Sequence, residues 1–448
     1  MKHIHATLAL LFLNFTGTSQ TKYSLKEAIT YATSNSYSVK SLEIDERMAT
    51  AQKGEQTSRA LPQINGNVDY LHYQQIQKNI LENGVGLINR TDIPKGTVIP
   101  TQLGLPNQLI PTVSGSQVIF DQSYFTSIHA AKIYQDLSEK NVTRSKIDVA
   151  VAVTRAYYAV LVNEEQLQYL DANLARLDSS FVQAKAQYAE GLIRIIDLDR
   201  IEVSYNNLKE ERNRIHRMVD LSQSLLKFQM SLSDRAPLIL TDSLDENLLQ
   251  DVAAVAQESK ANYANRIEYS ILETQTLLRK IDTRNAQASR YPRLSAIGLI
   301  GYNPGASQFT NLTQSSRWIQ YSYLGLRLQV PIFNGLLAKY KVQQKHLEED
   351  RIKLYRGQLE RTIDLEVDQA ITNLQNSMES LKTQRRNLQL AEKNLRLFKA
   401  ESSEGLVTNL EVTVAEADLK QAQTNYYNAL YGALVSKAEY QKALGILL

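Results

Sequence analysis

The stretch that decides the fold occurs twice in this chain. Residues 188–202 have the sequence YAEGLIRIIDLDRIE, and residues 402–416 have the sequence SSEGLVTNLEVTVAE. The tripeptide Glu-Gly-Leu at 190–192 returns at 404–406, 214 residues further on. Glycine readily adopts the left-handed backbone conformation that ends many helices. Each copy is therefore predicted to be the turn of a helical hairpin, and the two copies indicate an internal duplication.

Long heptad patterns lie on both sides of each turn. Apolar residues recur every seven positions before the first turn and before the second, at Val153, Val160, Leu167, Leu174 and Phe181 and at Val367, Leu374, Leu381, Leu388 and Leu395. This spacing is the a/d seam of helices that pack along one another. A helix from Ser123 to the first turn would be about 100 Å long, far beyond an ordinary globular helix. We therefore predict long helical hairpins over 123–232 and 335–446.

Period-two patterns precede each of these helical hairpins. Apolar and polar residues alternate at 64–70, 112–120, 294–302 and 324–330. Such alternation predicts strands with one apolar and one polar face. We predict β-hairpins over 63–120 and 293–332, and a long surface loop at 74–111 because of its prolines and glycines.

Short helices are predicted before each β-hairpin, over 24–60 with a break near Asn35 and over 245–290. The order of elements is then the same in both halves of the chain. We predict two structural repeats, at 20–232 and 233–448.

The spacing between matching residues shows where the two halves differ in length. Pro62 and Pro292, before the strands, are 230 residues apart, whereas Phe120 and Phe333, after them, are 213 apart. The difference therefore lies in the loop between the two strands of each half, as expected for a variable surface loop.

The N-terminus and the composition indicate an exported protein. An apolar run at Leu8–Leu13 and small residues ending near Ser19 predict a secretory signal peptide at 1–19, with a buried N-terminal helix as the alternative. The 448 residues contain no cysteine, which excludes disulfides, thiol chemistry and a lipidated cysteine. A net charge of +3 argues against a nucleic-acid partner.

Chemistry-bearing motifs are absent from the sequence. The six histidines are scattered without metal-ligand spacing, and there is no phosphate-binding glycine loop. We expect no catalytic residue, no cofactor and no metal site. An exported enzyme that uses carboxylates such as Asp197 and Glu202 is a poor alternative, because residues in heptad hairpins offer no pocket.

The predicted strands require more than one chain. Two strands are not stable alone, and four cannot close a barrel. Apolar and polar positions alternate along them, and aromatic residues lie near their ends, at Tyr70, Tyr73, Tyr302, Trp318, Tyr321 and Tyr323. This pattern is typical of strands that face lipid, with rings at the membrane interface. Several chains are therefore expected to share one barrel.

At this point the chain resembles the TolC-like outer-membrane efflux channels of Gram-negative bacteria. The resemblance rests on Leu61-Pro62, Pro292, the sequence PIFNG at 331–335 and the two Glu-Gly-Leu turns, and it spans the mature chain. It implies a fold that is mainly α with a membrane β portion. In that fold, a homotrimer forms a twelve-stranded β-barrel in the outer membrane and a long α-helical barrel in the periplasm. It also implies a belt of short helices at 24–45 and 233–262.

The two turns are the first candidate site. Gly191, Leu192 and Ile193, and likewise Gly405, Leu406, Val407 and Thr408, include apolar residues where turns are usually polar. The plain interpretation is a helix end with a hydrophobic contact. The resemblance implies that these residues dock a periplasmic adaptor protein.

Asp197 and Glu411 are the second candidate site, because each lies six residues after its glycine. Carboxylate rings around a narrow opening would favour cations. The alternative is an ordinary acid in a first helical turn. The resemblance implies a periplasmic gate, since the best-studied member has aspartates at both positions. Its arginine partner and a second gate aspartate match Val407 and Val414 here, so any closed state must be held differently.

These features predict an outer-membrane exit duct of a tripartite efflux or secretion system, without enzymatic activity. Its expected partners are two further copies of the chain, a periplasmic adaptor, an inner-membrane pump reached through that adaptor, and outer-membrane lipid. The alternative is a periplasmic coiled-coil adaptor or interaction protein, which would not need two strand hairpins with aromatic ends.

Overall fold

The computed structural model describes residues 22–84, 90–102, 104–244, 249, 262–404 and 406–447. The predicted signal peptide lies outside these residues, as does most of the part 245–261 of the helices predicted over 245–290. The chain forms two compact units. The helical unit comprises residues up to 45, 139–272 and from 356 onward, and the sheet unit comprises 46–138 and 273–355.

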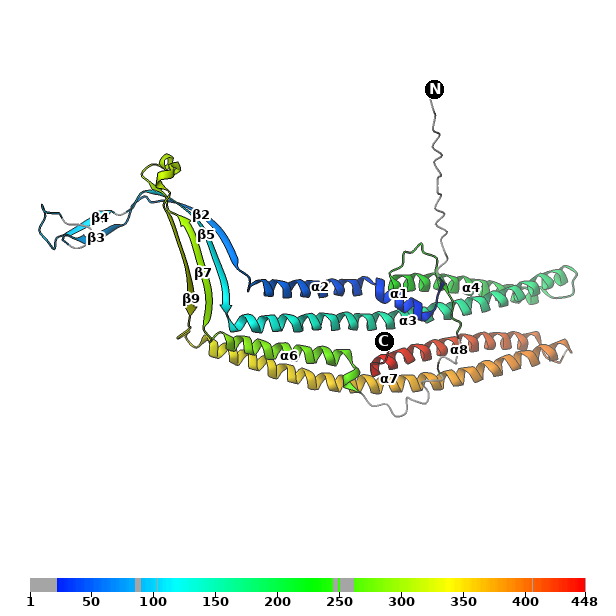
Figure 1. Cartoon of the computed structure of the whole chain (residues 1–448). Coiled ribbons are helices and arrows are strands. Elements are labelled where there is room, and N and C mark those ends of the chain that lie inside the picture. Colours follow the sequence, from blue (N-terminus) through cyan, green and yellow to red (C-terminus); the bar gives the residue numbers. More distant parts are fainter. Residues whose placement is uncertain are drawn as a thin grey trace, which may run out of the picture. The chain divides into compact units, whose positions relative to one another are not determined.

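Helices make up most of the described chain, and the prediction of a mainly α fold with a smaller β portion is confirmed. The α-helices are α1 (Leu25–Asn35), α2 (Tyr37–Ser58), α3 (Gln122–Ala189), α4 (Ile195–Met230), α6 (Ile267–Ala288), α7 (Leu337–Ser403) and α8 (Asn409–Leu444). In the helical unit, α3 and α4 form one hairpin, and α7 and α8 form the other (Figure 1). Within the described residues, no helix combines the length and the hydrophobicity that crossing a membrane requires.

The core of the helical unit is built from residues of the heptad seams. Val153 and Val160 of α3 are fully buried, in one cluster with Leu226 of α4 and Leu430 of α8. A second cluster contains Val367 of α7. Apolar side chains seven residues apart lie on one helix face and are buried together, which provides the main favourable free energy of such hairpins.

The start of the described chain is tied to the segment that follows α4. Strand β1 (Lys22–Tyr23) pairs in parallel with β6 (Ile239–Leu240). Asp242 accepts a hydrogen bond of 2.8 Å from the Leu25 N–H at the start of α1, and one of 3.1 Å from the Tyr157 hydroxyl. The predicted belt helix at 233–262 is therefore wrong for the described part, 233–244. Pro237 lacks the N–H that a helix interior requires, and the residues after it form a strand.

The sheet unit contains a four-stranded antiparallel sheet in the order β2 (Gln63–His72), β5 (Asn107–Phe120), β7 (Arg293–Tyr302) and β9 (Gln320–Gln329). A short strand, β8 (Gly305–Ala306), pairs with the start of β5. Strands β2 and β9 are the edges, and within the described chain each has a partner on one side only.

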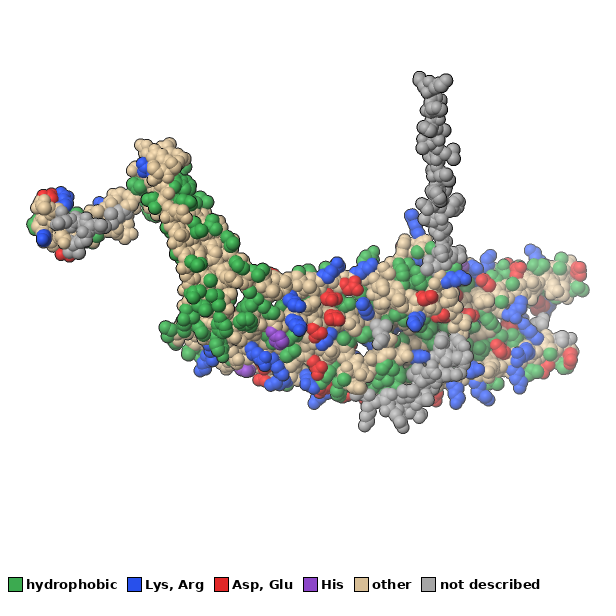
Figure 2. Space-filling model, in the orientation of Figure 1, with side chains coloured by type: hydrophobic (Ala, Val, Ile, Leu, Met, Phe, Trp, Pro, Cys, Tyr) green, Lys and Arg blue, Asp and Glu red, His purple; other side chains and the backbone are tan. Residues whose placement is uncertain are grey.

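The register separates apolar from polar residues. Residues that share the apolar face include Ile64, Val68, Val113, Ile300, Leu324, Leu326 and Leu328. The opposite face carries Asn65, Asn67, Asp69, Ser114, Ser116 and Arg327. Leu324 is 89% exposed and Ile64 is 73% exposed, so the apolar face is uncovered in the single chain. Figure 2 shows hydrophobic side chains gathered over the strands and charged side chains along the helices.

Two expectations about the strands are wrong. The predicted loop at 74–111 contains a two-stranded ribbon, β3 (Lys78–Glu82) and β4 (Val98–Gln102), and β5 already begins at 107. The prolines suggested a loop there. Pro111 of β5 has no paired residue on β7, so the strand does not need the N–H that proline lacks for a hydrogen bond to β7. In addition, Tyr321 and Tyr323 lie on the polar face rather than beside the leucines of β9.

Candidate functional site: the hairpin tips

The first tip has the geometry of a Schellman helix end. Gly191 has φ +76°, the Leu192 N–H donates to the Gln187 carbonyl at 2.8 Å, and the Gly191 N–H donates to the Tyr188 carbonyl at 2.9 Å. The turn is thus a regular helix end, as the alternative interpretation of these residues expects. This interpretation does not account for Leu192, whose side chain is 68% exposed, while Ile193 is half-buried.

The second tip repeats the outer bond of this motif. The Leu406 N–H donates to the Glu401 carbonyl at 3.0 Å, and the Leu406 side chain is 70% exposed. Val407 is half-buried, and Thr408 is the N-cap of α8. Gly405 lies outside the described residues.

The two predicted gate acids have different partners. Asp197 lies in the first turn of α4 and pairs with the Arg194 guanidinium, Nε to Oδ2, at 3.1 Å. Glu411 instead closes a capping box: its Oε2 accepts from the Thr408 N–H at 2.7 Å and from the Thr408 hydroxyl at 2.9 Å.

These contacts change the acidity of both groups. The hydrogen bond from Arg194 holds the pKa of Asp197 below its usual value. The backbone N–H of Thr408, followed by its hydroxyl, lowers the pKa of Glu411. Both carboxylates are therefore ionised at neutral pH, as a charged entrance requires.

Sequence reasoning missed the partners Arg194 and Thr408. The signal for the second was present, since Thr408-Asn409-Leu410-Glu411 has the Thr-x-x-Glu spacing of a capping box. For the first, an arginine three residues before an aspartate at a helix start was the available signal.

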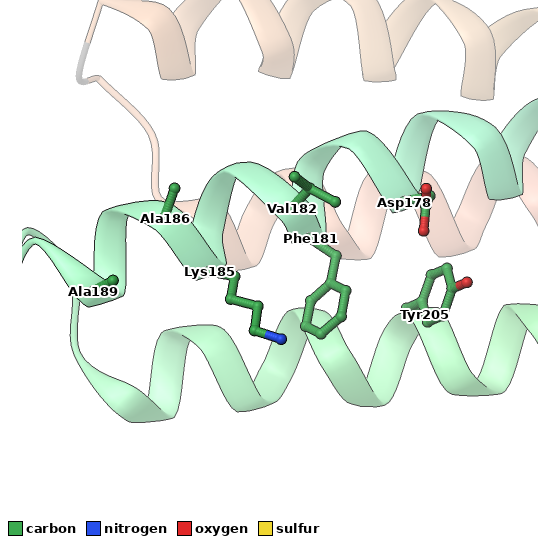
Figure 3. A pocket seen from close by; sticks show the side chains of 7 residues that line it. All are labelled: Asp178, Phe181, Val182, Lys185, Ala186, Ala189 and Tyr205. Carbon is green, nitrogen blue, oxygen red and sulfur yellow. The ribbon is translucent and has the colours of Figure 1, made fainter.

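A groove lies beside the first tip, between α3 and α4. It is lined by Phe181, Val182 and Lys185 of α3 and by Tyr205 of α4, among others, and Phe181 and Lys185 point toward α4 (Figure 3). The Phe181 and Tyr205 rings are stacked with centroids 5.6 Å apart. The second tip has a comparable groove between α7 and α8, lined in part by Glu411 and Val414.

Among the described residues, no group of three His, Cys, Asp or Glu side chains is placed to hold a metal ion. The tips offer exposed apolar side chains, charged carboxylates and shallow grooves. Such surfaces suit protein contact and ion attraction.

Comparison with known proteins agrees with this architecture. A sequence model described as outer membrane efflux protein matches residues 272–446. Outer membrane protein TolC of Escherichia coli is 20% identical over 340 residues, covering 74% of this chain and 68% of TolC. The solved structure of CusC has a TM-score of 0.72 at 16% identity and covers 95% of this chain and 93% of its own. The CmeC outer membrane channel of Campylobacter jejuni has a TM-score of 0.71 at 15% identity, covering 95% and 86%.

Fold and similarities together define a class: outer-membrane channel proteins that conduct cargo and are not enzymes. Within this class, residues 272–446 match the outer membrane efflux protein family, and the chain is similar to TolC in sequence and to CusC in fold. Its location is the bacterial outer membrane, and it serves as an exit channel of an efflux system. The alternative of a periplasmic adaptor is not favoured.

Proposed function

We propose that three copies of this chain form one exit duct, with a twelve-stranded β-barrel in the membrane and an α-helical barrel in the periplasm. The observation that carries the proposal is the sheet of the sheet unit, whose apolar face is exposed and whose edges β2 and β9 are open. An open edge cannot stay unpaired within lipid, so β9 of one copy would pair with β2 of the next. The polar face would then line the lumen and the leucines of β9 would face lipid.

The division of the chain into repeats at 20–232 and 233–448 supports this proposal. Each half supplies two strands of the sheet and one helical hairpin. Three copies would supply six such halves, arranged with approximate sixfold symmetry in the helical barrel.

The tips would dock the adaptor. Leu192 and Leu406 remain exposed although each turn is already closed by its own backbone bonds. Apolar side chains that a turn does not need and does not bury are typical of a protein contact. Gly191, Ile193, Gly405, Val407 and Thr408 would shape the two contact loops. The inner-membrane pump would act through this adaptor and supply the energy for transport.

Asp197 and Glu411 would form acidic rings at the periplasmic entrance. Their support is their place in the first turn after each tip, together with hydrogen bonds that lower their pKa values further below neutral pH. Fixed negative charge at a narrow opening favours cations over anions.

The test is a matched pair of charge substitutions on the two faces of the sheet, one on β9 and one on the adjacent β7. Leu326→Lys places a charge on the proposed lipid face, which costs about 2–4 kcal/mol near the membrane midplane. Ser295→Lys places the same charge on the polar face, opposite Arg327. Heat-modifiable trimers in the outer-membrane fraction and single-channel conductance are measured. We expect Leu326→Lys to lose most trimer and Ser295→Lys to keep trimers and pores. Equal tolerance of both changes would refute a lipid-facing sheet.

A further inference from the structure

The aromatic pair on β9 has no role in the membrane contact described above. Tyr321 and Tyr323 lie on the polar face of the sheet, opposite the leucines. Their side chains are 40% and 51% exposed. A tyrosine ring at the lipid interface would lie on the apolar face, as Tyr70 and Tyr302 do. Two rings on the polar face therefore need another explanation.

Tyr321 lies flat against the sheet. Its cross-strand partner is Gly301, and a Cβ atom built there would be 3.0 Å from both Cζ and the hydroxyl oxygen of Tyr321. The same position would lie 2.9 Å from Cγ2 of Thr112 on the next strand. The glycine thus provides the space in which the ring extends across β7 toward β5.

The pairing register places each ring at the end of a row of uncharged residues. One row runs from Asn67 through Thr112 and Gly301 to Tyr321. The adjacent row consists of Asn65, Ser114, Leu299 and Tyr323. Both rows combine an aromatic ring with hydroxyl and amide groups and carry no charge. Charged residues on this face, such as Asp69 and Arg327, lie outside the two rows.

We propose that Tyr321 and Tyr323 form a contact site for planar aromatic cargo inside the duct. This inference rests on the proposed function, because the polar face lines a lumen only if the sheet closes with other copies. Three copies would supply six rings, in two adjacent rows of the barrel. Ring faces attract aromatic and cationic groups, while the neighbouring hydroxyls and amides bind polar substituents. The site would favour aromatic organic molecules over hydrated metal ions.

The experiment is single-channel recording in planar bilayers with two monovalent probes of equal charge. Ethidium is planar and aromatic, and tetraethylammonium is neither. We expect ethidium to cause resolved current blocks and tetraethylammonium to cause none. Tyr321→Ala with Tyr323→Ala should shorten the blocks about fivefold, as expected for the loss of exposed ring contacts. Tyr321→Phe with Tyr323→Phe should retain them.

A matched glycine pair tests the geometry without removing a ring. Gly301→Ala forces the Tyr321 ring away from the wall, whereas Gly325→Ala, on the same face, meets no atom within 4 Å. We expect Gly301→Ala to change the duration of ethidium blocks at least twofold and Gly325→Ala to leave it unchanged. All variants are first checked for wild-type trimers and conductance of the open pore.

The outcomes separate the inference from the proposed function. Conducting pores with identical ethidium blocks in the wild type and the double alanine variant would overturn the aromatic site and leave the duct intact. Well-folded trimers that form no pore would overturn the duct and the site together.

Discussion

The two hairpin tips have the same turn but stabilise it differently. At the first tip, the N-cap residue Arg194 makes no side-chain capping bond and pairs instead with Asp197. At the second, Thr408 and Glu411 cap α8 reciprocally. Glu411 is thus committed to the backbone, whereas Asp197 is balanced by a neighbouring cation. Acids at matching positions of the two tips therefore need not have the same role.

The tips also differ in exposed apolar surface. Beside Leu192, the first tip exposes Ile195 and Ile196 in the first turn of α4, at 51% and 49%. At the second tip, Leu406 is followed by the half-buried Val407 and then by the polar N-cap Thr408. The first tip is consequently the better candidate for the main adaptor contact, and the following predictions test this asymmetry.

The largest effect is expected from charge at the apolar tips. Leu192→Asp should lower pump-dependent efflux about tenfold, because central apolar contacts dominate protein interfaces. Leu406→Asp should lower it about threefold, since the described residues that follow it, Val407 and Thr408, are half-buried and polar, respectively. Efflux of a pump substrate is measured in cells that carry the pump, the adaptor and this channel. Unchanged conductance of the purified variants is the control, and equal losses would contradict the asymmetry.

The next effect concerns ion selectivity. Asp197→Asn leaves the Arg194 cation unpaired, so we expect the K⁺/Cl⁻ permeability ratio to fall about threefold. Glu411→Gln also removes one negative charge, one that pairs with no cation at its capping box, and a similar decrease, about threefold, is expected. Reversal potentials across a salt gradient give the ratio.

The matched control is Arg194→Gln combined with Asp197→Asn, which removes both charges of the pair. This double variant should recover most of the wild-type ratio. A wild-type ratio in all three variants would remove both acids from the conduction path.

A smaller, local effect is expected from the capping box. Thr408→Ala should destabilise the first turn of α8 by about 1 kcal/mol. Hydrogen exchange at the Glu411 amide should then become about fivefold faster, by the same free energy. Arg194→Ala should change exchange at the Asp197 amide less than twofold, because no side-chain capping bond is lost. Similar acceleration at both tips would show that they are stabilised alike.

The smallest effect is the pH dependence of the tips. The folded pKa values of Asp197 and Glu411 lie below their ordinary values of 3.8 and 4.5. Groups with lowered pKa stabilise the fold above the unfolded pKa, and this contribution is lost as pH falls through the folded pKa. Cation selectivity should therefore persist from pH 7 to about pH 5 and decline below the ordinary carboxyl range. A marked decline already at pH 6 would contradict the hydrogen-bonded state of these carboxylates.

Much of the fold could be predicted because its signals are local. The seven-residue spacing of Val153 and Val160 marks a helix face that must be buried, and the alternation at Ile64–Tyr70 marks a strand. Helix α3 ends at Ala189, and the turn after it uses Gly191 at φ +76°, a conformation that few other residues adopt without strain. The repeat of these signals also predicts the tip residues and the two acids for which we propose a function.

Tertiary structure alone decided the remaining features, because they depend on pairs of residues far apart in sequence. No periodic sequence pattern predicts the parallel pairing of β1 with β6. The same is true of the hydrogen bond that Asp242 accepts from the Leu25 N–H. Sequence alone determined which residues of a strand share a face. Only the register of β7 with β9 decided that Tyr321 lies over Gly301, since cross-strand neighbours are fixed by long-range hydrogen bonds.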